Sequence, residues 1–223
     1  MAKLIWDNVG DRFYETGVSN GVLYPENESG EYPKGVAWNG LTSVSESPSG
    51  AEANKQYADN INYLTLYSAE EFGFTIEAFT NPDEFAECDG SAVVNGVQLT
   101  MQDRKRFGFV FKSIIGNDTK AENNGYKLHL IYCAKASPSD NQFSTINDSP
   151  EPITMSWECT TTPIVVDNSG LYKPTSRLII DSTKADSVKL KALEDILFGT
   201  ETLEARLPLP AEIISKMAMD GGH

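Results

Sequence analysis

Side chains that could carry out catalysis are few in this chain of 223 residues. The two histidines are His129, within a strand-like pattern, and His223, at the C-terminus. They cannot supply a His-based triad or a multi-histidine metal site from well-placed residues. The sequence contains no GxSxG, Walker A, GxGxxG or HExxH pattern. We therefore expect no catalytic residue, no cofactor and no enzymatic activity.

Two other groups of side chains have chemistry of their own. The acids Asp83, Glu84, Glu87 and Asp89 are close in sequence. Such carboxylates can bind Ca²⁺ or act as the acid and base of a glycosidase, but these lack EF-hand spacing, and a solvated or lining surface explains them more simply. Three cysteines are present: Cys88, Cys133 and Cys159. Their wide spacing favours reduced, buried thiols over disulfides or a zinc site, so we expect no metal.

The formal net charge of −14 is distributed unevenly along the chain. Between Glu26 and Asp89 there are thirteen Asp or Glu residues and two Lys, whereas the span from Asp103 to Lys135 holds seven Lys or Arg and three acids. A strongly negative surface repels polyanions over a Debye length of roughly 8 to 10 Å. Patches of opposite sign also allow head-to-tail association between copies, although plain solvation explains such charge as well.

Alternation of apolar and polar residues is the dominant periodicity. In the segment 153–160 every second residue is apolar, and the segments 72–78 and 107–111 repeat this pattern, as expected for strands with one buried face. Further β-rich runs bounded by turn residues cover 13–24, 36–45, 57–67, 126–136 and 177–181. This set of strands predicts a mainly β fold, a sandwich or a barrel.

Two helices are predicted near the C-terminus. The first covers 183–199, with Thr183 as N-cap, Asp186 at N3 and an apolar stripe between. Gly199 sits where a left-handed C-cap belongs, and the second helix begins at Pro210, whose fixed φ suits the first helical position. We expect one domain over 1–223, divided into an N-terminal arm and first strand (about 1–34), a β-sandwich (35–182), the helix (183–199) and a C-terminal arm (200–223).

Several long, ordered strings resemble a known family. The longest are RFYETGVSNGVLY (12–24), GVAWNGL (35–41) and SVSESPSGAE (43–52). Shorter strings continue the likeness: YADN (57–60), SAEEF (68–72), PDEF (82–85), GYKLHL (125–130) and WECTTTP (157–163). Over residues 4 to 165, and more weakly to about 215, the sequence resembles the major tail protein, or tail tube protein, of long-tailed bacteriophages of Gram-positive hosts. The ending Gly221-Gly222-His223 departs from the family pattern and is either natural variation or an added remnant.

The resemblance implies a tail-tube β-sandwich or partial barrel with a flanking helix and extended arms at both ends. It implies that six copies form a ring whose inner strands join into one barrel around a lumen, and that rings stack into a tube. Barrel closure across subunits would pair edge strands that a monomer must otherwise protect. The implied partners are further copies of the chain, a tape measure protein, a tail terminator and a distal tail protein, without a membrane. The implied location is the virion tail, after assembly in the host bacterial cytoplasm.

In such a tube the negative charge acquires a role. Double-stranded DNA carries one negative charge per roughly 1.7 Å, so a Lys or Arg lining would hold it, whereas a negative lumen lets it pass without specific binding. We predict that Glu77 and Glu158 face the lumen, because each lies on the polar side of a strand whose other side is apolar. The polar residues expected beside them are Thr75, Thr154, Ser156 and Thr160. The outer surface of the tube is the alternative placement.

Two further segments are predicted to contact neighbouring subunits. The stretch from Ser43 to Gln56 is interpreted as a Ser-rich hairpin tip that contacts the next ring, with an idle solvent loop as the alternative. Its candidate contact residues are Ser45, Glu46, Ser47, Pro48, Ser49, Gly50 and Glu52. The basic tripeptide Arg104-Lys105-Arg106 is expected to meet acids on a neighbour, or solvent, rather than nucleic acid, because the whole chain is strongly negative.

Two other functions remain alternatives on the sequence alone. The same fold would serve in the tube of a contractile tail or of a secretion-type injection particle. A secreted carbohydrate-binding or glycoside-cleaving β-sandwich belongs to a different class. It would use Trp38, Trp157 and several tyrosines to stack on sugars, and paired carboxylates for acid and base catalysis.

Overall fold

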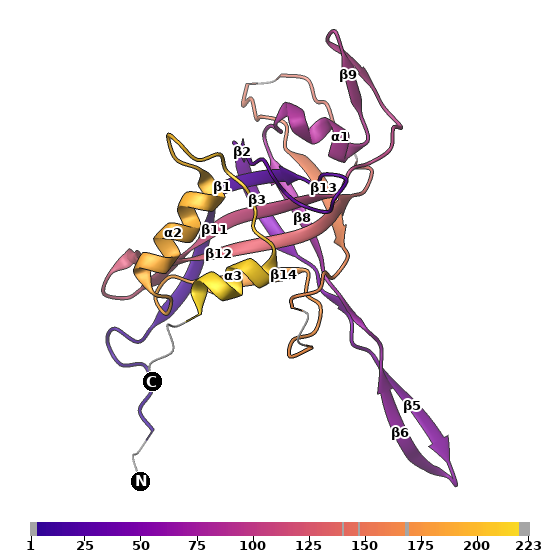
Figure 1. Cartoon of the computed structure of the whole chain (residues 1–223), viewed down its shortest axis with the longest axis vertical. Helices are drawn as coiled ribbons and strands as arrows, with labels where there is room; N and C mark the ends of the chain where they lie inside the picture. The colour runs from indigo at the N-terminus through magenta and orange to yellow at the C-terminus, as the bar shows by residue number, and fades with distance from the viewer. Residues whose placement is uncertain (1–3, 140, 147, 168–169, 219–223) are drawn as a thin grey trace.

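A computed structural model describes residues 4–139, 141–146, 148–167 and 170–218 (Figure 1). The main strands are β1 (Phe13–Pro25), β2 (Val36–Trp38), β3 (Leu41–Glu46), β8 (Gly73–Ala78), β11 (Phe107–Asn117), β12 (Ala121–Ala136), β13 (Met155–Thr161) and β14 (Arg177–Asp181). They form one antiparallel sheet in the order β2-β1-β11-β12-β13-β8-β3, with β14 also paired to β12. Strands make up 45% of the structure and helices 13%, which confirms the predicted mainly β fold.

The two ends of this sheet are brought together by the chain itself. Its terminal strands β2 and β3 are consecutive in sequence, and only Asn39 and Gly40 separate them. β1 shows two register irregularities between Thr16 and Val22. Irregularities of this kind bend a strand and increase its twist. The sheet therefore curls into a partial barrel instead of lying flat.

The inside of the curl holds an aromatic core. Trp38 lies near its centre, with ring centroids 4.6 Å from Phe85 and 5.4 Å from Trp157. The Trp38 Nε1 donates a hydrogen bond to the Thr80 carbonyl at 2.8 Å, so its polar atom is satisfied. Tilted and edge-on aromatic pairs of this kind add about 0.5–1.5 kcal/mol each beyond the buried area. The core thus ties β2 and the short helical segment at residue 85 to β13.

The opposite face of the sheet is covered by two helices, α2 (Ser187–Phe198) and α3 (Pro210–Met217) (Figure 1). Leu193 and Ile213 from the helices pack with Leu128, Leu130 and Val110 from the sheet. β11 and β12 are therefore buried on both faces along much of their length. The prediction of a single buried face for 107–111 is wrong, because Gly108 and Val110 between the phenylalanines are buried as well.

A β-bulge in β12 lets one strand serve two partners. Residues 127–131 pair with β14, and residues 134–136 pair with β13. Between them Tyr132 and Cys133 both face the helix-covered core, and Cys133 has a positive φ of 50°. One extra residue reverses which side each later residue faces, so Ala134 and Ala136 turn into the aromatic core.

The helix predictions are right in kind and partly wrong at their ends. Asp186, not Thr183, is the N-cap of α2, because its carboxylate accepts from the backbone N–H groups of Val188 and Lys189 at 3.0 and 2.9 Å. Thr183 is instead hydrogen bonded to Asp181. The structure confirms Pro210 at the first position of α3, and α2 ends at Gly199 as predicted. The expected left-handed cap conformation is wrong, because Gly199 has φ 77° but ψ 170°. The ending Gly221-Gly222-His223 lies outside the described residues.

The predicted C-terminal arm over 200–223 does not extend from the body in the part that the structure describes. Leu207 is 3% exposed and its N–H donates to the Tyr32 carbonyl at 3.1 Å. Ile213 of α3 is equally buried. This segment returns to the sheet because its apolar residues close the helix-covered core.

The remaining elements are short, and the hairpins among them project from the body. These elements are β4 (Ser49–Gly50), β5 (Ala53–Ala58), β6 (Ile61–Tyr67), β7 (Glu70–Glu71), η1 (Asp83–Phe85), α1 (Ala86–Asp89), β9 (Ala92–Val94) and β10 (Val97–Leu99). The β5–β6 hairpin reaches far from the sheet at one end of the molecule, and β9 stands at the opposite end (Figure 1). The sequence patterns predicted strand over 57–67 but did not predict the β9–β10 hairpin.

Candidate functional site

The glutamates predicted to line a lumen lie on neighbouring strands and share one face of the sheet. β13 pairs with β8 so that Glu158 is opposite Thr75 and Ser156 is opposite Glu77. Directly opposed residues in an antiparallel pair project to the same side. These four side chains therefore form one continuous polar patch, of which Glu158 is exposed and Glu77 half-buried.

The other side of the same strands faces the aromatic core. Phe74 and Ile76 of β8 and Trp157 of β13 are buried there, which confirms the alternation read from the sequence. Thr160 continues the polar patch, opposite Gly73 of β8, whereas Thr154 lies exposed one residue before β13 begins. The register thus brings five of the six predicted residues together on paired strands, and their role as a lumen lining stays a prediction.

The polar patch extends onto β3. Ser43 is opposite Glu77, and its Oγ donates a hydrogen bond to the Glu77 carboxylate at 2.7 Å. Ser45, predicted as a ring-stacking residue, is opposite Thr75 and so belongs to this patch by register. Because Glu77 is held by Ser43 while Glu158 is exposed, Glu158 is the more accessible of the two carboxylates.

Residues 47–72 form a long projecting arm between β3 and β8. Its tip is the turn at Asp59 and Asn60, which have φ values of 51° and 66°. Positive φ at both central residues is the geometry of a type I′ turn, which matches the twist of the flanking strands. The predicted tip from Ser43 to Gln56 is therefore wrong. Most of those residues form the base and one strand of the arm, because the chain continues to the turn before it reverses.

The predicted stacking residues lie at this base. Glu46 ends β3, and the Ser47 N–H donates to the Gly73 carbonyl at 2.8 Å. Ser49 and Gly50 form β4, which pairs with β7. The exposed Glu52 is held through its backbone: its N–H donates to Ser68 Oγ at 3.0 Å, and its carbonyl accepts from the Ser68 N–H at 3.1 Å. The Pro48 side chain is exposed between the two short pairings. Contact with another ring through these residues stays a prediction.

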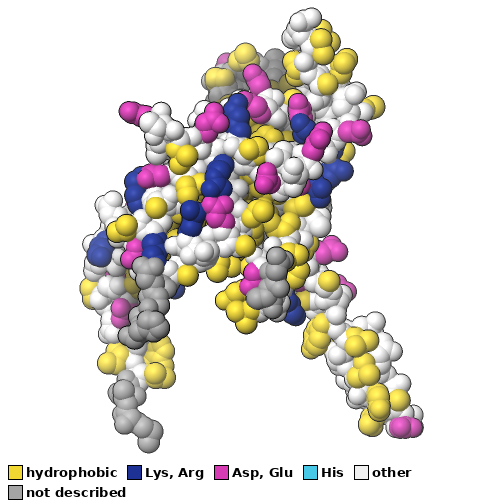
Figure 2. Space-filling model, viewed as in Figure 1, with side chains coloured by type: hydrophobic (Ala, Val, Ile, Leu, Met, Phe, Trp, Pro, Cys, Tyr) yellow, Lys and Arg dark blue, Asp and Glu magenta, His cyan; other side chains and the backbone are white. Residues whose placement is uncertain are grey.

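The outer part of the arm carries large apolar side chains that the described chain does not cover (Figure 2). The most exposed are Tyr57 (70%), Ile61 (61%), Tyr63 (67%), Leu66 (57%) and Tyr67 (71%). An isolated two-stranded hairpin is at best marginally stable in water, and exposed strand edges invite pairing with another chain. Lys55 and Asp59 are the charged residues of the segment 53–67, so this surface is nearly free of charge repulsion.

The arm is anchored to the body by a cluster around Glu46. Its carboxylate pairs with Arg177 of β14 and lies 3.6 Å from the Nδ1 of His129 on β12. The Arg177 guanidinium also stacks over the Phe72 ring, 4.8 Å from its centroid, so both strands at the base of the arm contact the same cation. His129 itself is 8% exposed and stacks on Phe111 with centroids 4.4 Å apart. Burial lowers the pKa of His129.

This cluster also brings a serine, a histidine and a glutamate into line. Ser113 Oγ lies 2.9 Å from His129 Nε2, on the side of the ring away from Glu46. Triads of this order activate a serine when the base is hydrogen bonded on both sides, at about 2.6–3.2 Å. Here the 3.6 Å separation between Glu46 and His129 is too long, and Glu46 is engaged by Arg177. These contacts therefore suit a structural link between the arm and the sheet better than proton transfer.

The basic tripeptide is paired within the chain. Arg104 lies 3.6 Å from Asp89 and donates to the Ala136 carbonyl at 3.0 Å. Lys105 pairs with Glu87, and Arg106 Nε lies 3.2 Å from Glu26. Three cations that we predicted to meet a neighbour therefore first neutralise acids of their own chain. Their contact with another subunit stays a prediction.

The acid group at 83–89 is part of a short helical turn. Phe85 and Cys88 anchor this turn in the aromatic core. Burial raises the pKa of Asp89, and nearby Arg104 opposes that rise. Across the described ranges, no group of three or more His, Cys, Asp or Glu side chains is arranged to hold a metal ion.

The tryptophans required by the carbohydrate hypothesis are not available to a sugar. Trp38 and Trp157 are each 3% exposed and contact each other inside the aromatic core. Stacking on a sugar needs an open ring face. The prediction that these two rings form a sugar platform is therefore wrong.

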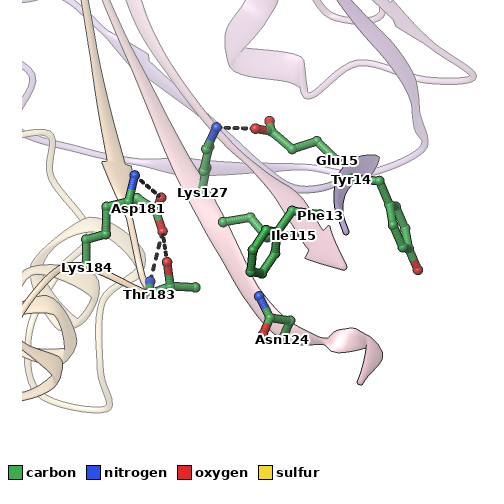
Figure 3. A pocket seen from close by; sticks show the side chains of 9 residues that line it. All are labelled: Phe13, Tyr14, Glu15, Ile115, Asn124, Lys127, Asp181, Thr183 and Lys184. Atoms are coloured by element: carbon green, nitrogen blue, oxygen red, sulfur yellow. Dashed lines mark hydrogen bonds and ion pairs between the residues drawn. The ribbon is translucent and has the colours of Figure 1, made fainter. Parts of the chain in front are cut away.

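A pocket of about 580 Å³ lies where the outer ends of β1, β11, β12 and β14 meet (Figure 3). Its lining residues are Phe13, Tyr14, Glu15, Ile115, Asn124, Lys127, Asp181, Thr183 and Lys184. Lys127 pairs with Glu15, and Lys184 lies 3.4 Å from Asp181, so each charged side chain of the lining is paired. Sequence reasoning missed this pocket because its walls come from segments far apart in the chain.

The comparisons with known proteins found similar solved structures but no family for this chain. No family model matches it, and no curated protein matches it. Among solved structures, it is similar to a chain in the structure of the anti-feeding prophage cap, the tube terminating cap (10% identity, TM-score 0.38, covering 81% of this chain and 96% of that one). A chain of the baseplate of the same prophage gives 9% identity, a TM-score of 0.38 and coverage of 81% and 99%.

A third solved structure is the sheath-tube complex of an extracellular contractile injection system in its extended state. It gives 11% identity, a TM-score of 0.31 and coverage of 73% of this chain and 88% of that one. These three solved structures are thus of tube, cap and baseplate parts of contractile injection particles. With TM-scores of 0.31 to 0.38, these likenesses fix neither a family nor a function. Within the described residues, no helix has the length and apolar character needed to cross a membrane.

Proposed function

We propose that this chain is a structural tube subunit of a phage tail or a phage-like injection particle, and that it acts by self-assembly rather than by catalysis. The observation that carries the proposal is the exposed apolar surface of the arm. Tyr63 and Tyr67 on its outer part are 67% and 71% exposed, and the segment 53–67 carries only one Lys and one Asp. Large exposed apolar patches mark interaction surfaces. A neighbouring subunit would cover this patch and stabilise a hairpin that is marginal alone.

The finer assignment rests on the sequence resemblance. It favours the major tail protein of a long-tailed phage, with six copies in each ring and DNA passing through the lumen. The polar patch containing Glu77 and Glu158 supports a non-adhesive wall, because it presents carboxylates without a neighbouring basic residue on the paired positions of β8 and β13. Tape measure, terminator and distal tail proteins are the expected further partners, within the virion.

Electron microscopy of the purified protein tests the proposal directly. We expect rings or hollow tubes in negative stain and a fast-sedimenting species in ultracentrifugation. The double variant Tyr63→Ser with Tyr67→Ser should not form tubes, because it removes the exposed aromatic side chains of the arm without touching the core. Val188→Ser on α2 is the matched control, since Val188 is 76% exposed on a different surface.

Three results would contradict the proposal: persistent wild-type monomers across concentration, ionic strength and divalent cations; arm variants that assemble as well as the wild type; or equal loss in the Val188 control. Electron microscopy of particles isolated from the source would distinguish a contractile tail from the tail of a long-tailed phage. A sheath around the tube indicates the contractile kind, and a bare tube indicates the long-tailed phage.

A further inference from the structure

A second uncovered apolar hairpin stands at the other end of the molecule. β9 and β10 are joined by Asn95 and Gly96, both with positive φ, and pair with Val94 opposite Val97 and Ala92 opposite Leu99. Opposed residues share a side, so these four apolar side chains make one face of the hairpin. Val94, Val97 and Leu99 are 55%, 60% and 49% exposed.

This hairpin has no charge. Residues 91–102 contain no Asp, Glu, Lys or Arg, in a chain whose net charge is −14. The segment 53–67 of the arm has one Lys and one Asp, and so is also neutral overall. Two copies of a strongly negative chain repel one another wherever their carboxylates meet. They can approach closely through a pair of neutral, apolar surfaces such as these.

The positions of the two hairpins determine how copies would meet. They lie at opposite ends of the long axis of the molecule (Figure 1), and hydrophobic side chains gather at both ends (Figure 2). The arm of one copy can therefore reach the β9–β10 hairpin of another copy but not its own. A contact between two different surfaces is heterologous, and its repetition along the long axis produces a stack.

We propose that the apolar face of the β9–β10 hairpin is the docking surface for the arm of a second copy of this chain. The arm face that it fits is the one formed by Ile61, Tyr63 and Tyr67, alternate residues of β6 that are each more than 60% exposed. Each hairpin alone has two strands and no second layer, and stacking them face to face gives each the layer that it lacks. This inference rests on the proposed function, because it names the surface that receives the arm in a stacked tube.

Cysteine cross-linking between copies tests the contact. A protein with Val97→Cys is mixed with a protein with Tyr63→Cys, assembled and oxidised. The native Cys88, Cys133 and Cys159 are buried and leave the background low. A disulfide-linked dimer should form in the mixture and not from either protein alone. The matched control pairs Tyr63→Cys with Val93→Cys, because Val93 is 58% exposed on the opposite face of the same hairpin and should cross-link far less.

A second experiment measures the protein concentration at which tubes appear. Val97→Asp should raise it about tenfold or more, since the substitution places a charge in an apolar contact, whereas Val93→Asp should change it little. Wild-type tubes without the Val97–Tyr63 cross-link, or equal assembly of both Asp variants, would overturn the docking surface and leave the proposed function standing. Wild-type protein that forms no rings or tubes would overturn the proposed function and this inference with it.

Discussion

Removing the Glu46 carboxylate should weaken the base of the arm more than its place at the surface suggests. Glu46 pairs with Arg177 and lies 3.6 Å from His129. In the described part of the chain, the Arg177 Nη1 and His129 Nδ1 atoms that face it are buried and make no hydrogen bond to another group. Glu46→Ala would therefore leave a half-buried guanidinium without its counter-charge.

The size of the effect follows from the exposure of the pair. Breaking a fully buried ion pair costs about 3–5 kcal/mol, whereas an exposed pair contributes about 0–1 kcal/mol. The side chains of Glu46 and Arg177 are 31% and 29% exposed, which lies between these limits. We expect the free energy of unfolding to fall by about 1–2 kcal/mol, which lowers Tm by about 2–8 °C in a domain of this size.

Thermal unfolding followed by circular dichroism at neutral pH would measure this change. Glu52→Ala is the matched control, because Glu52 is an exposed acid of the same arm base and its side chain makes no ion pair within the described residues. A double-mutant cycle with Arg177→Met isolates the pair energy. The reasoning is refuted if Glu46→Ala and Glu52→Ala unfold within about 0.5 kcal/mol of each other, a typical surface effect, or if the two changes in the cycle are additive.

Three further predictions concern pH, the base of the arm and the polar patch. Burial lowers the pKa of His129, so its contribution to stability is complete above its unfolded value of about 6.5 and is lost as pH falls from there toward the folded value. Tm should drop more steeply between pH 7 and 5.5 in the wild type than in His129→Gln, and equal slopes would contradict this. Gly50→Ala should destabilise by about 2 kcal/mol or more, because φ is +82° and the new Cβ would lie 2.1 Å from the Ala69 carbonyl oxygen. Gly96→Ala, with φ +80° and open space, should cost about 1 kcal/mol in the same melts, and equal losses would remove the steric explanation. Replacing Glu77 and Glu158 together by Lys should permit tube assembly but reduce DNA ejection from particles, and unchanged ejection would reject them as lumen residues.

Short sequence patterns predicted correctly those features that depend on neighbouring residues alone. The alternation over 153–160 predicted β13, because a strand places every second residue on one side. The same period placed Glu158 on a polar face. Gly199 and Pro210 marked helix ends correctly because their backbone preferences act within a residue or two.

The predicted start of α2 was wrong because nearby polar residues compete for the same hydrogen bonds. Thr183 and Asp186 are both acceptable N-caps by residue type. The Asp181 carboxylate accepts hydrogen bonds from the N–H and the hydroxyl of Thr183, and so the helix begins later, at Ser187. Likewise the Ser-rich composition of 43–56 indicated a turn, whereas strand pairing continues to Asp59 and Asn60.

By itself, then, the sequence determined a mainly β chain with a flanking helix, an acidic polar strand face and a shortage of catalytic side chains. Only the tertiary structure decided that Trp38 and Trp157 are core residues and that Arg104, Lys105 and Arg106 are paired within the chain. It also decided that two neutral apolar hairpins stand at opposite ends. The physical reason is that pairing and burial depend on residues far apart in the chain, which the periodicity of a short segment does not record.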